Sequence, residues 1–188
     1  MSQSLALCTM RLSAFLKSSS NPELDGTLKE IYDALQELAT ETRSLTYELS
    51  PPVLYDFGLE TAVKGLCERM AEKHNLTVLY EDNGQTKPLE KNIRVELYRM
   101  TRELLVNAVK HARAKCIKVG IPRSDTAVKI TVQDNGVGFD TKILAPAHGG
   151  SGFGLFSIRE RLDYMGGHIE AESKKGQGSR ITIVTPIK

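Results

Sequence analysis

A heptad repeat of mainly apolar residues is the feature that most constrains this chain. Its members alternate in spacing between four and three positions, and they are Leu24, Leu28, Ile31, Leu35, Leu38, Thr42, Leu45 and Leu49. Such spacing draws one seam along a helix and is typical of helices that pack at a shallow crossing angle. A shorter segment repeats it with Leu5, Cys8, Leu12 and Phe15. The stretch KSSSNPE separates the two segments, so we expect a helical hairpin over residues 1–50.

A hairpin of two helices cannot bury such a seam by itself. Pairing two hairpins into a four-helix bundle would bury it, and the sequence therefore predicts a homodimer through residues 1–50. The alternative is that the seam packs on the rest of the same chain. The first helix starts almost at Met1 and is much shorter than the second. We therefore expect the chain to be a fragment whose first helix begins further upstream.

Pro51 and Pro52 end the long helix and open a second region, residues 51–188. Expected helices lie near residues 58–73, 89–112 and 155–165. Expected strands are LTVLY, KCIKVGI, AVKITVQ, GHIEAES and SRITIVTPI. Because strands and helices do not alternate regularly, the sheet should be mixed or antiparallel rather than doubly wound. The sequence predicts an α+β fold, a two-layer α/β sandwich, preceded by the helical hairpin.

Composition argues against several classes of protein. The net charge is +2 with acids and bases interspersed, whereas a nucleic-acid binder should carry a basic stripe. The three cysteines lie far apart and the four histidines lack metal-ligand spacing, which favours reduced thiols in the cytoplasm over disulfides or zinc. No apolar run approaches the roughly 18 residues of a membrane span. A membrane anchor would have to lie in a missing upstream region.

A polar stripe runs along the expected helix 89–112. Glu103, Asn107, Lys110 and His111 fall at positions i, i+4, i+7 and i+8, so they share one face. Such a face is often simply solvated. Here, however, a carboxylate, an amide and two nitrogen groups could hold hydrated Mg²⁺ and a polyphosphate. Mg²⁺ keeps several waters and takes one or two protein oxygens, so Asn107 is a candidate metal ligand and Glu103 could hold a coordinated water.

A glycine-rich stretch, HGGSGFGLFSIRER, opens the expected helix 155–165. Glycines before a helix expose backbone N–H groups at the positive end of the helix dipole, which suits phosphate. The stretch lacks the lysine of a P-loop and departs from the Gly-x-Gly-x-x-Gly dinucleotide fingerprint. Neither of those two folds is supported.

The stretch QDNGVGFD follows an alternating strand and places Asp134 at the strand's end. An Asp-Asn-Gly sequence could form a hairpin turn. A hairpin should lead into a second alternating strand, but VGFDTKILAPAHGG has no alternation. The alternative is that Asp134 faces a ligand and that Gly136 and Gly138 let this ligand approach the backbone.

Together, these motifs resemble the GHKL ATPase superfamily, with its Bergerat fold, over roughly residues 55–188. The matching stretches are ELLVNAVKHA, DNGVGF, GSGFGLFSIRERL, GGHIEAES and GQGSRITIVTP. They are similar to the ATP-binding domain of bacterial two-component sensor histidine kinases of the NarL/DesK type. ELSPPVLYDFGLETAV resembles the passage from the dimerisation helices to that domain. The resemblance implies a truncated dimerisation and phosphotransfer hairpin in residues 1–50 and an ATP-binding catalytic domain in residues 51–188.

The resemblance implies roles at the adenine and metal ends of the site. Asp134 would accept a hydrogen bond from the adenine N6 amine, and Gly136 and Gly138 would let the base approach the backbone. Asn107 would ligate Mg²⁺. Glu103 would be the nearby general base or would position water.

The resemblance also implies contacts to the ATP phosphates. Lys110 and His111 would meet them, and a lid over about 141–150 would close on ATP. Further contacts would come from the loop and helix start, at Gly150, Gly152, Phe153, Gly154 and Leu155. Thr182, on the last strand, would lie near adenine.

As a kinase, the parent protein would pass the γ-phosphate of ATP to a histidine and then to an aspartate in the receiver domain of a response regulator. The family carries that histidine on its first helix, but this chain begins MSQSLAL and has no histidine before His74. We therefore do not expect it to phosphorylate itself. Two alternatives remain: a serine kinase of the anti-sigma type, and a nucleotide-gated dimeric scaffold without chemistry.

Overall fold

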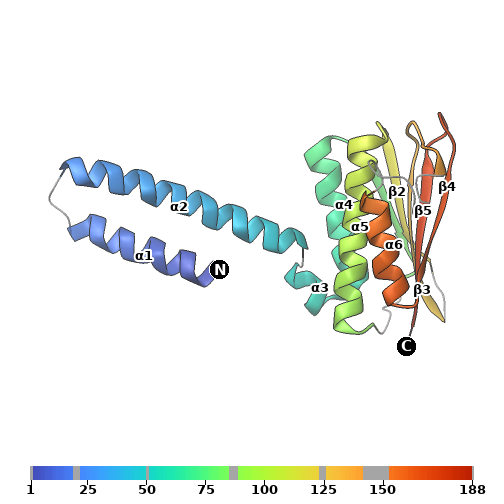
Figure 1. The fold of residues 1–188 in the computed structure, drawn as a ribbon, viewed down its shortest axis with the longest axis horizontal. Coiled ribbons are helices and arrows are strands. Elements are labelled where there is room, and N and C mark those ends of the chain that lie inside the picture. The colour runs from blue at the N-terminus through green and yellow to red at the C-terminus, as the bar shows by residue number, and fades with distance from the viewer. Residues whose placement is uncertain are drawn as a thin grey trace. The chain divides into compact units, whose positions relative to one another are not determined.

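The computed structural model describes residues 2–18, 22–49, 51–84, 89–122, 126–141 and 153–187. The chain divides into two compact units, Met1–Pro51 and Pro52–Lys188. In the first unit, α1 (Ser2–Ser18) packs against α2 (Pro22–Leu49), which confirms the expected helical hairpin (Figure 1). Ile31 and Leu38 of the heptad seam remain 47% and 50% exposed within this unit. One hairpin therefore leaves part of its apolar seam in water.

The second unit contains four helices and five strands in its described residues. The helices are α3 (Pro52–Asp56), α4 (Gly58–His74), α5 (Lys91–His111) and α6 (Phe153–Tyr164). The strands are β1 (Thr77–Asp82), β2 (Cys116–Ile121), β3 (Ala127–Asp134), β4 (His168–Ser173) and β5 (Ser179–Pro186). The strand order is β1-β2-β3-β5-β4, in which β1 and β2 are parallel and the other pairs are antiparallel.

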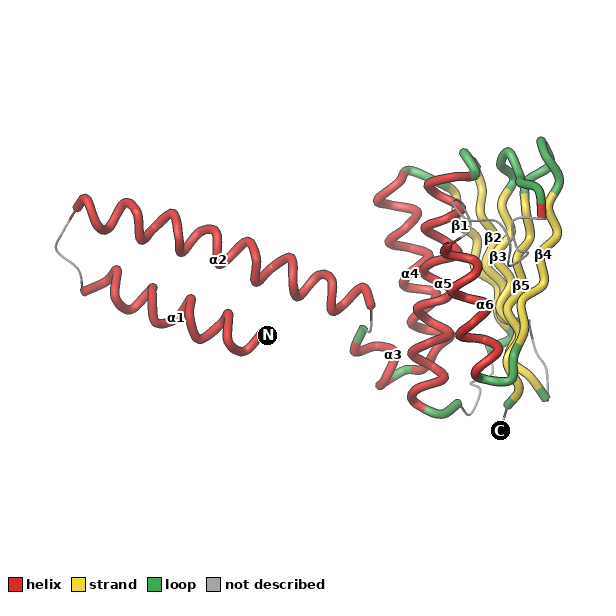
Figure 2. Tube along the Cα trace, in the orientation of Figure 1, coloured by secondary structure: helices red, strands yellow, loops and turns green. Residues whose placement is uncertain are grey.

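Helices α4, α5 and α6 lie along one face of this sheet, as Figures 1 and 2 show. The mixed sheet and the two layers confirm the predicted α+β sandwich. The parallel pair β1–β2 is joined through α5, because parallel neighbours need a crossover rather than a tight turn. None of the described helices is long and apolar enough to cross a membrane.

The core lies between the helices and the covered face of the sheet. On β3, Val128, Ile130 and Val132 are buried, while Lys129 between them is exposed. This alternation follows from the two-residue period of a strand. The facing helix positions are also almost fully buried; they include Leu97, Met100 and Leu105 of α5 and Ile158 and Leu162 of α6. The packing fixes the rotation of α5 and α6, and with it the direction of their polar faces.

The cysteines offer a direct test of this packing. Cys67 of α4 lies in the core, and burial raises its pKa to about 12, whereas Cys8 of α1 is exposed. Thiol reagents attack the thiolate, so we expect Cys8 to be labelled under native conditions and Cys67 only after unfolding. Mass spectrometry after labelling with and without denaturant measures both sites. Native labelling of Cys67 as fast as that of Cys8 would contradict the packing of α4.

Candidate functional site

Asp134 is a buried carboxylate held in a fixed orientation at the end of β3. It is 6% exposed, its Oδ1 accepts a hydrogen bond from the Gly136 amide at 2.8 Å, and its Oδ2 accepts one from the Ser179 hydroxyl. Ser179 is also its register partner on β5. An ionised carboxylate offers about four acceptor positions, so each oxygen keeps capacity for a further donor. Both oxygens are held in place by these bonds and keep acceptor capacity beyond them.

The glycines after Asp134 pack directly on the chain's own backbone. A Cβ at Gly136 would lie 2.0 Å from the carbonyl oxygen of Ala112, at the end of α5. Gly138 has a φ of +61°, and a Cβ there would lie 2.2 Å from the carbonyl oxygen of Lys174. These two contacts join the loop to α5 and to the β4–β5 turn. The sequence did not predict this packing, and the approach of a base to the loop stays a prediction.

Asn135 holds the loop after β3 in place, a structural contact that the sequence analysis missed. Its Oδ1 accepts hydrogen bonds from the backbone amides of Lys115 and Cys116, both at 3.0 Å. The bonds tie the loop to the start of β2, next to Asp134. The only sequence signal was the Asp-Asn-Gly run itself, because asparagine side chains often bond to nearby backbone groups.

The polar stripe of α5 and the glycine-rich start of α6 come together. A Cβ built at Gly154, in the first turn of α6, would lie 3.0 Å from Oε1 of Glu103 and 3.2 Å from Nδ2 of Asn107. The absence of a side chain at this position lets the helix start lie against both polar groups. Two motifs that are 47 residues apart in sequence, from Asn107 to Gly154, thus lie side by side.

The other predicted phosphate contacts are placed less completely. Lys110 and His111 are exposed in the last turn of α5. Leu155 is half-buried on α6 and packs against the core. Phe153 is the first residue of α6. Gly150, Gly152 and most of the expected lid lie outside the described residues.

Thr182 and Asp134 lie on opposite faces of the sheet, and the place of Thr182 near adenine stays a prediction. The hydroxyl of Thr182 is 3.2 Å from that of Thr131, on the sheet face opposite to the buried Ile181 and Ile183. Asp134 shares the helix-covered face because it has the same parity as the buried positions of β3. Ser179, in the GQGS stretch, is the β5 residue that lies beside the aspartate.

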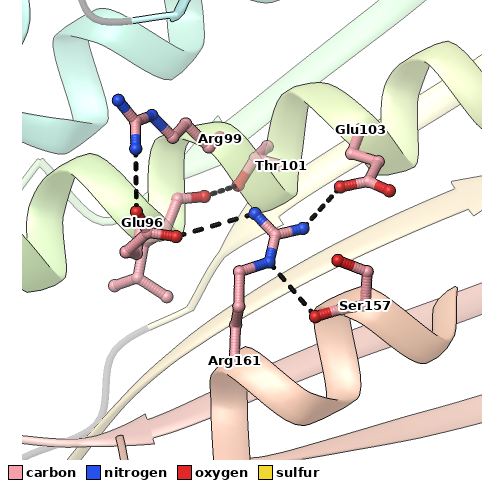
Figure 3. A network of polar contacts seen from close by, with 7 residues as sticks. Glu96, Arg99, Thr101, Glu103, Ser157 and Arg161 are labelled. Atoms are coloured by element: carbon pink, nitrogen blue, oxygen red, sulfur yellow. Dashed lines mark hydrogen bonds and ion pairs between the residues drawn. The ribbon is translucent and has the colours of Figure 1, made fainter. Parts of the chain in front are cut away.

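A network of charged side chains joins α5 to α6 behind this site. Arg161 Nη2 lies 2.6 Å from Oε2 of Glu103, and its Nη1 lies 3.6 Å from Oε2 of Glu96 (Figure 3). Arg99 contacts the other oxygen of Glu96 at 2.9 Å. Two acidic and two basic groups therefore alternate along the contact between the two helices.

A polar groove of about 560 Å³ opens next to Asp134 and Ser179. Its lining includes Thr141, at the start of the expected lid. Further lining residues are Gln133, Glu172, Lys174, Gln177 and Arg180. The carboxylate therefore lies at the edge of an accessible space.

Comparison with known proteins gives a consistent family. Residues 92–188, just over half of the chain, match the family described as histidine kinase-, DNA gyrase B-, and HSP90-like ATPase. An uncharacterized sensor-like histidine kinase of Chloroflexus aurantiacus is 32% identical over 194 aligned positions, covering 99% of this chain and 32% of the relative. The oxygen sensor histidine kinase NreB of Staphylococcus carnosus is 29% identical, covering 88% and 47%. The chain thus spans about a third to a half of these relatives.

Solved structures agree on the fold. The histidine kinase domain of the Erythrobacter litoralis EL346 blue-light activated histidine kinase matches 98% of this chain and 94% of its own, with a TM-score of 0.64 and 14% identity. The catalytic domain of histidine kinase ThkA covers 69% of this chain and 92% of its own, with a TM-score of 0.57 and 25% identity.

Proposed function

Because the chain belongs to the histidine kinase-, DNA gyrase B-, and HSP90-like ATPase family and carries the ATP-binding domain of a sensor histidine kinase, we propose that it binds Mg·ATP for phosphoryl transfer to a histidine. The observation that carries this proposal is the meeting of Glu103 and Asn107 with the start of α6 at Gly154. A helix start favours phosphate, and the two side-chain oxygens suit a hydrated Mg²⁺.

At the phosphate end, Asn107 would hold Mg²⁺, and the ion when bound would neutralise charge on the phosphates. Glu103 would accept a proton from the acceptor histidine or orient a water. Lys110 and His111, in the last turn of α5, would meet the phosphates, as would the amides at the start of α6. Catalysis would come mainly from positioning and charge stabilisation.

At the base end, Asp134 would accept a hydrogen bond from the adenine N6 amine. The bonds from Gly136 and Ser179 hold its two oxygens in place before the ligand arrives. Guanine presents a carbonyl oxygen where adenine presents this amine, so a fixed carboxylate would face a second acceptor. The site would therefore prefer ATP to GTP.

The parent protein would act as a homodimer through the hairpin and would transfer the phosphoryl group to a response regulator receiver domain. The exposed Ile31 and Leu38 support the pairing of hairpins. Since no histidine precedes His74, this polypeptide would need an acceptor histidine from elsewhere and would not phosphorylate itself. The domain would work in the cytoplasm, as the family resemblance implies.

A calorimetric titration of ATP and GTP with Mg²⁺ tests this function. We expect ATP to bind and GTP to bind far more weakly. Asp134→Ala should lose roughly 1.5–3 kcal/mol of binding free energy, because a charge-assisted hydrogen bond is removed. Asp134→Asn keeps the shape of the side chain and should also weaken ATP binding. It replaces the alanine variant if alanine disturbs the fold.

Asp82→Ala is the matched control. Asp82 also ends a strand and accepts a hydrogen bond from the amide two residues later, but it is exposed on β1. Asp82→Ala should therefore leave ATP affinity unchanged. Equal binding of ATP and GTP, or equal effects of the two alanine variants, would contradict the role of Asp134. A folded wild-type chain that binds neither nucleotide would contradict the proposed function.

A further inference from the structure

Arg161 reaches back along α6 toward the start of that helix. Its Nε donates to the carbonyl oxygen of Ser157 at 3.1 Å, one turn earlier. Its Nη2 donates to Glu103 at 2.6 Å, and its Nη1 lies near Glu96 (Figure 3). The guanidinium is thereby held by its own helix while it contacts α5. Lysine could not reproduce this pattern, because its ammonium group lacks the planar set of donors.

The carboxylate of Glu103 lies against two different turns of α6. Oε2 bonds to Arg161 in the third turn, and Oε1 lies beside Gly154 in the first turn. The bond to Oε2 therefore determines where Oε1 points, which is toward the helix start and the neighbouring Asn107. Without that bond, a glutamate that is 31% exposed would be free to sample other rotamers.

Among the neighbouring carboxylates, Glu103 is the main ion-pair partner of Arg161. Glu96 has a second cation, Arg99, at 2.9 Å, whereas its distance to Arg161 is 3.6 Å. Glu103 and Arg161 form the shorter contact. Removal of the charge at position 161 should therefore affect mainly the orientation of Glu103. The proposed function places this side chain next to the phosphates.

We propose that Arg161 is a positioning residue that fixes the Glu103 carboxylate, with Oε1 turned toward the start of α6, for its contact with Mg·ATP. The inference rests on the proposed function. In the absence of Arg161, the carboxylate would lose its fixed orientation toward hydrated Mg²⁺, and its negative charge near the phosphates would lose its counter-charge. Both effects weaken the binding of a polyanion.

The test is a double-mutant cycle on the dissociation constant of Mg·ATP, measured by calorimetry with the full chain. We expect Arg161→Met to weaken binding about tenfold, since bonds between charged groups are of that order. In the Glu103→Ala background the same change should cost less than about twofold, because the partner is gone. Arg161→Lys should restore part of the affinity, since it keeps the charge.

Arg159→Met is the matched control. Arg159 lies on the same helix and forms an ion pair with Asp163, one turn further along α6, at 3.9 Å. Arg159→Met removes the same charge from α6 as Arg161→Met does, and it should leave ATP affinity within about twofold of the wild type. Thermal unfolding of each variant identifies any general loss of stability.

Each outcome decides the inference. An Arg161→Met variant that binds like Arg159→Met overturns it while the proposed function stands. An equal loss in the Glu103→Ala background also overturns it, because Arg161 would then act without Glu103. Absence of ATP binding by the folded wild type overturns the proposed function and this inference together.

Discussion

Gly136→Ala is expected to destabilise the ATP-binding unit by about 3 kcal/mol, because it forces an atom into well-packed backbone. The new Cβ would lie 2.0 Å from the carbonyl oxygen and 2.6 Å from the carbonyl carbon of Ala112. That carbonyl also accepts the Val137 amide at 2.8 Å, so relief of the clash would stretch this bond. Urea unfolding followed by circular dichroism measures the loss.

Gly176→Ala separates crowding from backbone strain. Gly176, in the turn between β4 and β5, has a φ of +79°, but a Cβ there would meet nothing within 4 Å. Its replacement should cost only about 1–2 kcal/mol, the strain of a left-handed conformation. Similar losses for the two variants would contradict the close approach of the loop to α5. Gly136→Ala should also lower ATP affinity. The clash would shift the backbone amide at position 136, which orients Asp134.

Local periodicity explains why much of the fold could be predicted from the sequence. The alternation around Val128, Ile130 and Val132 identifies β3, and the heptad spacing identifies α2, because each pattern depends on the geometry of one element. Strand order, by contrast, cannot be predicted from a local pattern. The parallel pairing of β1 with β2 joins segments on either side of α5 and leaves no local pattern.

The same distinction applies to the candidate site. Glu103 and Asn107 could be placed on one face of α5 because they are one helical turn apart. The place of Ser179 beside Asp134, by contrast, depends on the register of β3 with β5. The pairing of Arg161 with Glu103 crosses 58 positions and depends on how two helices pack. Neither contact could be predicted from local spacing, since strand register and helix packing are not visible in it.

Leu54→Ala is expected to lower the free energy of unfolding of the second unit by about 2–5 kcal/mol, the range for truncating a buried leucine. Leu54 lies in the short helix α3, two residues after Pro52, and its side chain is fully buried. Arg94 of α5 donates to the carbonyl oxygens of Leu54 at 3.2 Å and Leu89 at 3.1 Å. These contacts join α3 to the first turn of α5.

Leu79→Ala provides the control in the same unit, because Leu79 of β1 is 42% exposed. It should cost less than about 1 kcal/mol, since less apolar surface is lost from the core. Urea unfolding measures both variants. If Leu54→Ala costs as little as Leu79→Ala, α3 is a dispensable linker. If Leu54→Ala costs several times more, the folded unit begins at Pro52. In that case α3, which follows the hairpin in sequence, stabilises the helix that carries Glu103 and Asn107.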